Sequence, residues 1–137
     1  MMTAGRPDEP SLPPGAPVEQ PDGHAVELRL PPDPEYLRLA RYAAADAATR
    51  AGLGIDATDD LRLAVSESCG LLTGSDVPIV LRFDAGTGQV VVHGDGAPGP
   101  GLEGENGELA RSLVEAVVDE LDFEVDGDRA SFRIVKS

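Results

Sequence analysis

Hydrophobic spacing between Leu61 and Leu72 predicts an amphipathic helix. Apolar residues recur there at intervals of three and four, as one face of a helix requires. That face carries Leu61, Val65, Cys69 and Leu72. A single carboxylate, Glu67, stands on a neighbouring face among apolar residues. We therefore expect this helix to pack its first face into a core and to direct Glu67 toward a pocket.

The flanks of this helix carry start and stop signals. Ile55 is apolar and precedes Asp56, which we expect to be the N-cap, and further carboxylates in the first turn suit the helix dipole. Gly74 follows the last periodic residues and predicts the end of the helix.

Before this helix the pattern predicts a strand and an earlier helix. Residues 25–30 alternate apolar and polar letters, the period of a half-buried strand, and two prolines then end it. A Pro at the first helical position favours a helix from residue 35 to about Ala51, ending at Gly52. The second half of this helix is rich in alanine, which permits close packing on a sheet and has high helix propensity.

After the central helix, two hairpins and a third helix are expected. Residues 79–83 and 89–93 alternate around a glycine-containing turn, and residues 123–125 and 130–135 are joined at Asp126-Gly127. Between the hairpins, residues 94–107 hold six glycines and two prolines and predict a flexible loop. Residues 108–121 predict a helix whose packing side carries Leu109, Leu113, Ala116, Val117 and Leu121.

This order of elements predicts an α+β two-layer sandwich, a mostly antiparallel mixed sheet with helices on one face. Residues 23–137 form one domain in this interpretation, since 137 residues suffice for one core. Residues 1–22 contain six prolines among glycines and acidic residues, and we expect a disordered tail. A proline-rich ligand segment around residues 12–14 is the alternative for this tail.

The formal net charge of −14 argues against direct nucleic-acid binding, because phosphate contacts need Lys and Arg clusters. A basic protein surface is the more natural partner. The single cysteine, Cys69, cannot form an internal disulfide and lies on the predicted buried face. No apolar run approaches about 18 residues, and the N-terminus lacks an apolar leader segment. We therefore expect a soluble cytoplasmic protein without a membrane partner.

The letters Ala-Val-Ser-Glu-Ser-Cys-Gly-Leu-Leu at residues 64–72 resemble the N box of the GHKL ATPases, in particular anti-sigma factors of the SpoIIAB/RsbW type. The order of elements is similar over residues 26–136. The resemblance implies the GHKL ATPase fold with a short lid, ATP with magnesium as cofactor, and Glu67 as general base. In the family, an Asn one turn later holds the magnesium. Here Leu71 replaces it, and a leucine cannot supply the oxygen ligand that magnesium needs.

The resemblance also implies a D-x-G-x-G segment that binds the nucleotide, after the strand at residues 89–93. One register aligns Asp95, Gly96 and Gly99 as candidate cofactor-binding residues, and it lacks the middle glycine. The other register places Gly94 at the aspartate position. Glycines matter here because backbone N–H groups must approach phosphate closely. These incomplete matches favour weak or absent ATP binding.

The phosphate-binding glycines of the family correspond here to Glu108 and Ala110. A carboxylate near a triphosphate is repelled by about 1 kcal/mol or more. This position also argues against a bound nucleotide.

As function, the resemblance implies an anti-sigma factor that sequesters an alternative sigma factor of the stress or sporulation class. A STAS-type anti-anti-sigma partner would release it, and the family implies a homodimer. Arg41, with Arg38 nearby, occupies the position of a first-helix arginine that contacts both partners in the family. An ordinary solvated arginine is the alternative at that position.

Two other functions stay open. The chain could be an active ATP-dependent serine/threonine protein kinase, with Glu67 activating the hydroxyl of its antagonist. Alternatively, Glu67 only accepts a hydrogen bond inside an inactive domain.

Overall fold

The structure, a computed structural model, describes residues 25–137. The predicted tail at residues 1–22 lies outside this range. The elements, in order, are β1 (Ala25–Leu30), a 3₁₀ turn (Pro34–Tyr36), α1 (Leu37–Arg50), α2 (Ile55–Gly70), β2 (Ile79–Gly86), β3 (Gln89–Gly96), α3 (Gly104–Val117), β4 (Glu120–Asp126) and β5 (Arg129–Lys136).

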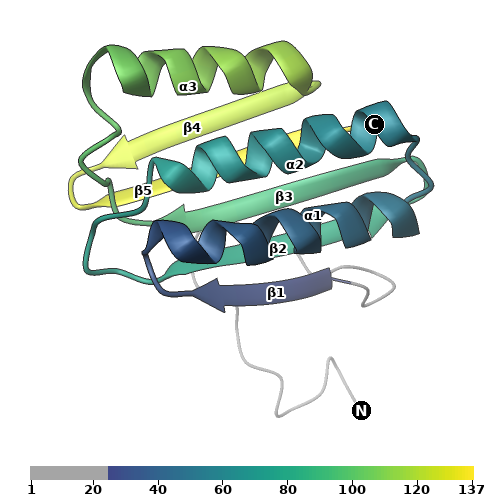
Figure 1. The fold of residues 1–137 in the computed structure, drawn as a ribbon, viewed down its shortest axis with the longest axis horizontal. Helices are drawn as coiled ribbons and strands as arrows, with labels where there is room; N and C mark the ends of the chain where they lie inside the picture. The colour runs from purple at the N-terminus through teal and green to yellow at the C-terminus, as the bar shows by residue number, and fades with distance from the viewer. Residues whose placement is uncertain (1–24) are drawn as a thin grey trace, which may run out of the picture.

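The five strands form one open sheet in the order β1-β2-β3-β5-β4, and every neighbouring pair is antiparallel. All three helices lie on one face of this sheet (Figure 1). The predicted α+β two-layer architecture is confirmed. The parallel pairing that a mixed sheet would need does not occur between the strands of residues 25–137.

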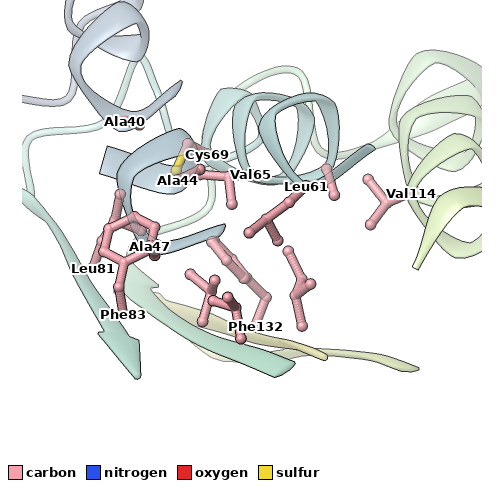
Figure 2. Close-up of a cluster of buried hydrophobic side chains, with 14 of the residues drawn as sticks. Ala40, Ala44, Ala47, Leu61, Val65, Cys69, Leu81, Phe83, Val114 and Phe132 are labelled. Atoms are coloured by element: carbon pink, nitrogen blue, oxygen red, sulfur yellow. The ribbon is translucent and has the colours of Figure 1, made fainter. Parts of the chain in front are cut away.

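The core lies between the sheet and α1 and α2. Alternate residues of the central strands point to the helices, because successive side chains of a strand face opposite sides. These buried strand residues are Ile79, Leu81, Phe83, Val90, Val92, Phe132 and Ile134. They meet the predicted buried face of α2, and Figure 2 shows Leu61 and Val65 pointing toward the sheet with Phe132 rising from below.

Helix α1 approaches its neighbours closely because its inner face consists of small side chains. Ala40, Ala44, Ala47 and Ala48 have no exposed surface. The helix contacts α2 and strands β2 and β3. The prediction of an alanine-rich helix up to Ala51 is confirmed, and Gly52 follows it with a φ of 80°, a conformation that glycine adopts without strain.

The predicted N-cap of α2 is wrong. The cap is Gly54, whose carbonyl accepts bonds from the backbone N–H and the hydroxyl of Thr58 at 2.9 and 2.8 Å. Asp56 therefore lies inside the first turn. The α-helix ends at Gly70, and three tighter turns lead to Gly74, whose φ of 87° ends the helical path where the sequence predicted.

The predicted flexible loop at residues 94–107 is shorter than expected. Strand β3 continues to Gly96, and α3 begins at Gly104, four residues before the predicted start. Only residues 97–103 connect them. Glycine content overestimated the length of this loop, because the glycines of β3 serve close packing rather than flexibility.

The predicted packing side of α3 is partly wrong: Val117 and Leu121 pack against the core as expected, whereas Leu109 and Leu113 do not. Leu109 and Leu113 are 68% and 40% exposed, whereas Val114 is buried. Figure 2 shows Val114 pointing toward Leu61 of α2. Leu121, predicted as the end of this helix, belongs to β4. The inner face of α3 is therefore narrow, and its larger apolar side chains face outward.

The C-terminal end of α3 is held by one lysine. Lys136 of β5 is largely buried, and its ammonium donates to the Val117 carbonyl at 2.8 Å and to the Asp60 carboxylate at 3.2 Å. This side chain therefore connects β5, α2 and the end of α3 at one point.

Candidate functional site

Asp60 meets Lys136 beside the end of α3, and Glu67 follows Asp60 by two helical turns on α2. Helical spacing therefore places Glu67 on the side of α2 toward α3. It is half-buried, one helical turn after the buried Ala64. Helices α2 and α3 pack against each other. The sequence correctly predicted a carboxylate outside the main core face of the helix.

The position one turn after Glu67 supplies no ligand. Leu71 is 5% exposed, so its side chain is packed in the interior. Its carbonyl oxygen accepts a bond from the N–H of Gly99 at 2.9 Å. That contact ties the loop after β3 to the end of α2 and leaves the carbonyl engaged.

Gly99 is a site of close backbone packing. A Cβ added there would overlap the carbonyl oxygen of Thr73, well inside the 3.0 Å below which real Cβ contacts essentially never occur. The absence of a side chain thus lets the loop lie directly on the end of α2. Gly99 therefore permits a close approach between two segments of protein backbone.

Asp95 lies on the opposite face of the sheet from Glu67. Its neighbours in β3, Gly94 and Gly96, are buried on the helix side, and the pleat directs Asp95 to the other side. There its carboxylate pairs with Arg129 of β5, and both side chains are about half exposed. The structure therefore does not bring Asp95 together with Glu67.

The helix-facing position of the segment is Gly94, and the space beside it is filled. A Cβ at Gly94 would overlap ring atoms of Phe132, which is buried at 3% exposure. This ring stacks on Phe123, with centroids 6.2 Å apart and an interplanar angle of 16°. The pleat alone could have assigned Gly94 rather than Asp95 to the helix side, but only the structure reveals Phe132 as the residue that fills the space.

Gly96 is the third candidate of this segment, and it also contacts the core. A Cβ there would lie 3.4 Å from the Leu72 side chain, a tight contact with the end of α2. Gly96 and Gly99 therefore both lie against the Leu71–Gly74 region, whereas Asp95 does not.

The start of α3 is closed by its own preceding loop. A Cβ at Gly107 would overlap the carbonyl oxygen of Leu102. Glu108 and Ala110, the positions aligned with phosphate-binding glycines in the sequence analysis, lie within the helix, and Glu108 is exposed. Neither position lies in a turn that could surround an anion.

Arg41 and Arg38 occupy different places on α1. Arg41 is half-buried, and its guanidinium donates to the Ser66 hydroxyl of α2 at 3.0 Å. Arg38 is exposed and shares the outer face of α1 with Leu39 and Tyr42, which are 47% and 59% exposed. Sequence reasoning missed this pair of exposed apolar side chains.

Burial perturbs the pKa values of two further titratable groups. Complete burial raises the pKa of the Cys69 thiol to about 12. Partial burial lowers the pKa of His93, on the open face of the sheet; Asp84 opposes this shift, and Arg133 and Arg82 add to it. Among the described residues, no group of three or more His, Cys, Asp or Glu side chains could hold a metal ion. No helix between residues 25 and 137 is both long enough and apolar enough to span a membrane.

No protein-family model matches the chain. The serine-protein kinase RsbW of Bacillus velezensis is 39% identical over 44 residues, which is 32% of this chain and 28% of that protein. The same-named kinase of Listeria monocytogenes is 44% identical over 43 residues, 31% of this chain and 27% of its own length. RsbW of Bacillus subtilis is 39% identical over 44 residues, again 28% of its length. The chain therefore has partial similarity to the RsbW serine-protein kinases, over less than a third of each relative.

Proposed function

We propose that this protein is an anti-sigma factor of the RsbW type, which sequesters an alternative sigma factor and is released by a STAS-domain anti-anti-sigma partner. The partial similarity to RsbW and the α+β fold support this assignment. The observation that carries it is the outer face of α1, where Arg38 lies beside exposed Leu39 and Tyr42. Exposed aromatic and arginine side chains are typical of protein interfaces.

The net charge of −14 suits a basic partner surface, because opposite potentials accelerate encounter and disfavour wrong partners. Within this acidic molecule, Arg38 would pair with a carboxylate of the partner. Arg41 would act indirectly in this scheme, since its bond to Ser66 holds α1 against α2. Overlapping use of this surface by both partners would make release a matter of competition.

We also propose that the protein works with weak or no nucleotide. The residues near Glu67 do not fit a magnesium nucleotide, because Leu71 is buried and Asp95 faces away. Phe132 fills the space at Gly94. A magnesium site needs several oxygen ligands, and the α2 segment after Glu67 offers an engaged carbonyl and an isobutyl group instead.

An active kinase is the second candidate, favoured by the name of the RsbW relatives and by the half-buried position of Glu67. Calorimetry with ATP and magnesium, combined with phosphate transfer to a STAS partner, distinguishes the two. Micromolar ATP binding with transfer that Glu67→Gln abolishes would establish the kinase and refute the nucleotide-independent proposal.

The sigma-binding proposal is tested with purified sigma factors of the host and two matched arginine variants. Arg38→Glu should weaken binding by about tenfold or more, since a like charge replaces an attractive one at an interface. Arg50→Glu is the control, because Arg50 lies on the same helix in its last turn and pairs with Asp46 at 2.9 Å. If no sigma factor binds, the proposed function is refuted. If both variants bind equally well, the assignment of the α1 surface as the binding site is refuted.

A further inference from the structure

Helix α3 presents an apolar stripe to solvent. Leu109 and Leu113 are one turn apart and share a face, and Ala116 continues it by three residues. Their exposure contrasts with Val114, the one large apolar residue that α3 buries. An ordered helix with its two leucines outward has an amphipathic face that the described part of the chain does not cover.

A line of carboxylates runs beside this stripe. Glu105, Glu108 and Glu115 are exposed and recur at helical spacing along one flank of the stripe. No ion pair within residues 25–137 involves these three carboxylates. The nearby Arg111 is directed to β4, where its guanidinium carbon lies 5.2 Å from the ring centroid of Phe123. The stripe is therefore bordered by negative charge.

We propose that this α3 stripe is a docking surface for an amphipathic basic helix of a partner protein. The partner helix would place apolar residues at positions i, i+4 and i+7 against Leu109, Leu113 and Ala116. Its Lys and Arg residues, on one flank of that apolar face, would lie against the carboxylates of α3. The carboxylates beside the stripe favour a partner helix of positive charge, and the leucines supply the apolar contact.

A second copy of the chain fits this surface poorly. A symmetric contact through the stripe would bring the same carboxylates together, in two molecules that each carry a net charge of −14. Like charges that meet in an interface oppose association. A basic partner has no such opposition.

The inference is independent of the proposed function. Helix α2 lies between α1 and α3 (Figure 1), so the α3 stripe is separate from the outer face of α1. If binding at one of these two surfaces is disproved, the proposal for the other surface still stands.

Three labelled peptides test the proposal by fluorescence anisotropy with the full chain. The first is an amphipathic helix with a leucine stripe flanked by Lys and Arg, the second carries Glu in place of these basic residues, and the third has the composition of the first in scrambled order. We expect the first peptide to bind at least about tenfold more tightly than the other two. Its affinity should fall as the salt concentration rises. Equal binding of the scrambled peptide would reduce the effect to diffuse charge and overturn the proposal.

Variants locate the site. Leu109→Ser and Leu113→Ser should each weaken the first peptide by about tenfold, because each removes exposed apolar contact area. Ile55→Ser is the matched control, since Ile55 is 81% exposed at the start of α2. Equal loss in the control overturns the location. Sedimentation of the free protein supplies the remaining outcome: self-association that Leu109→Ser abolishes would assign the stripe to a second copy and refute the basic partner.

Discussion

Gly94→Ala should destabilise the protein, although it adds a single methyl group to a strand. The new Cβ would overlap the buried Phe132 ring. The ring cannot simply move aside, because it packs in the core and stacks on Phe123. Either the ring leaves its rotamer or the β3–β5 pair shifts, and both responses strain the middle of the sheet.

The size of the effect follows from two opposing terms. Overpacking of a close-packed core costs about 1–3 kcal/mol. Replacing glycine by alanine recovers about 0.4–1 kcal/mol, because the unfolded chain loses conformational freedom. The net expectation for Gly94→Ala is a loss of about 1–2 kcal/mol in the free energy of unfolding, and a loss of 2 kcal/mol in a domain of this size lowers Tm by roughly 8 °C.

A double-mutant cycle tests the cause. Phe132→Leu removes the ring at its own cost in packing, and Gly94→Ala in that background should become neutral or slightly stabilising. Gly101→Ala is the control glycine variant, because nothing lies within 4 Å of a Cβ there and its φ is not positive. Urea unfolding followed by circular dichroism measures the natural chain and all four variants.

Two results would refute the reasoning. A Gly94→Ala protein as stable as the natural chain would mean that the Phe132 ring does not fill this space. An equal penalty with and without the ring would place the cause elsewhere in the strand.

Three further predictions concern buried polar and titratable groups. Lys136→Met should cost about 1–3 kcal/mol, because it leaves Asp60 without its cation and an α3 carbonyl without its donor, whereas Arg50→Ala breaks an exposed pair and should cost under about 0.5 kcal/mol; equal urea midpoints for the two variants would contradict this. The Cys69 thiol, with its pKa raised to about 12, should react with a thiol reagent at pH 8 far more slowly in the folded than in the urea-unfolded chain, and equal rates would show that the thiol is accessible. His93 has a lowered pKa when folded, so the unfolded chain takes up its proton first and stability should fall as the pH drops through the ordinary value of 6.5. His93→Gln should reduce the change in urea midpoint between neutral and mildly acidic pH, and an unchanged difference would exclude His93 as its source.

The local elements followed from the sequence because their signals are local. Hydrophobic alternation defined β1 and both hairpins, and three- and four-residue spacing defined α2 and its buried face. The turn at Asp126-Gly127 joins β4 and β5 as predicted, with Gly127 at a φ of 63°. Alanine content indicated a closely packed first helix, and its inner alanines are fully buried.

The candidate site depended on contacts that no local pattern contains. Glu67 could be predicted as a carboxylate beside the core face of α2, because helical periodicity alone separates the two faces. The position of Phe132 beside Gly94 could not be predicted. Phe132 belongs to β5, which is distant in sequence from Gly94, and the two residues become neighbours only in the sheet. The bond between Arg41 and Ser66 likewise needs two helices to be packed together.

The sequence by itself determined the type and order of the helices and strands and that they make two layers, because backbone propensity and hydrophobic period act within a few residues. Only the tertiary structure decided which way α3 faces and which residue pairs with Asp95. Helix α3 lies beside the edge strand β4 (Figure 1), where a narrow inner face suffices. Leu109 and Leu113 therefore turn outward. Asp95 pairs with Arg129 because β3 continues as a strand through a glycine-rich segment, and that continuation depends on its neighbours in the sheet.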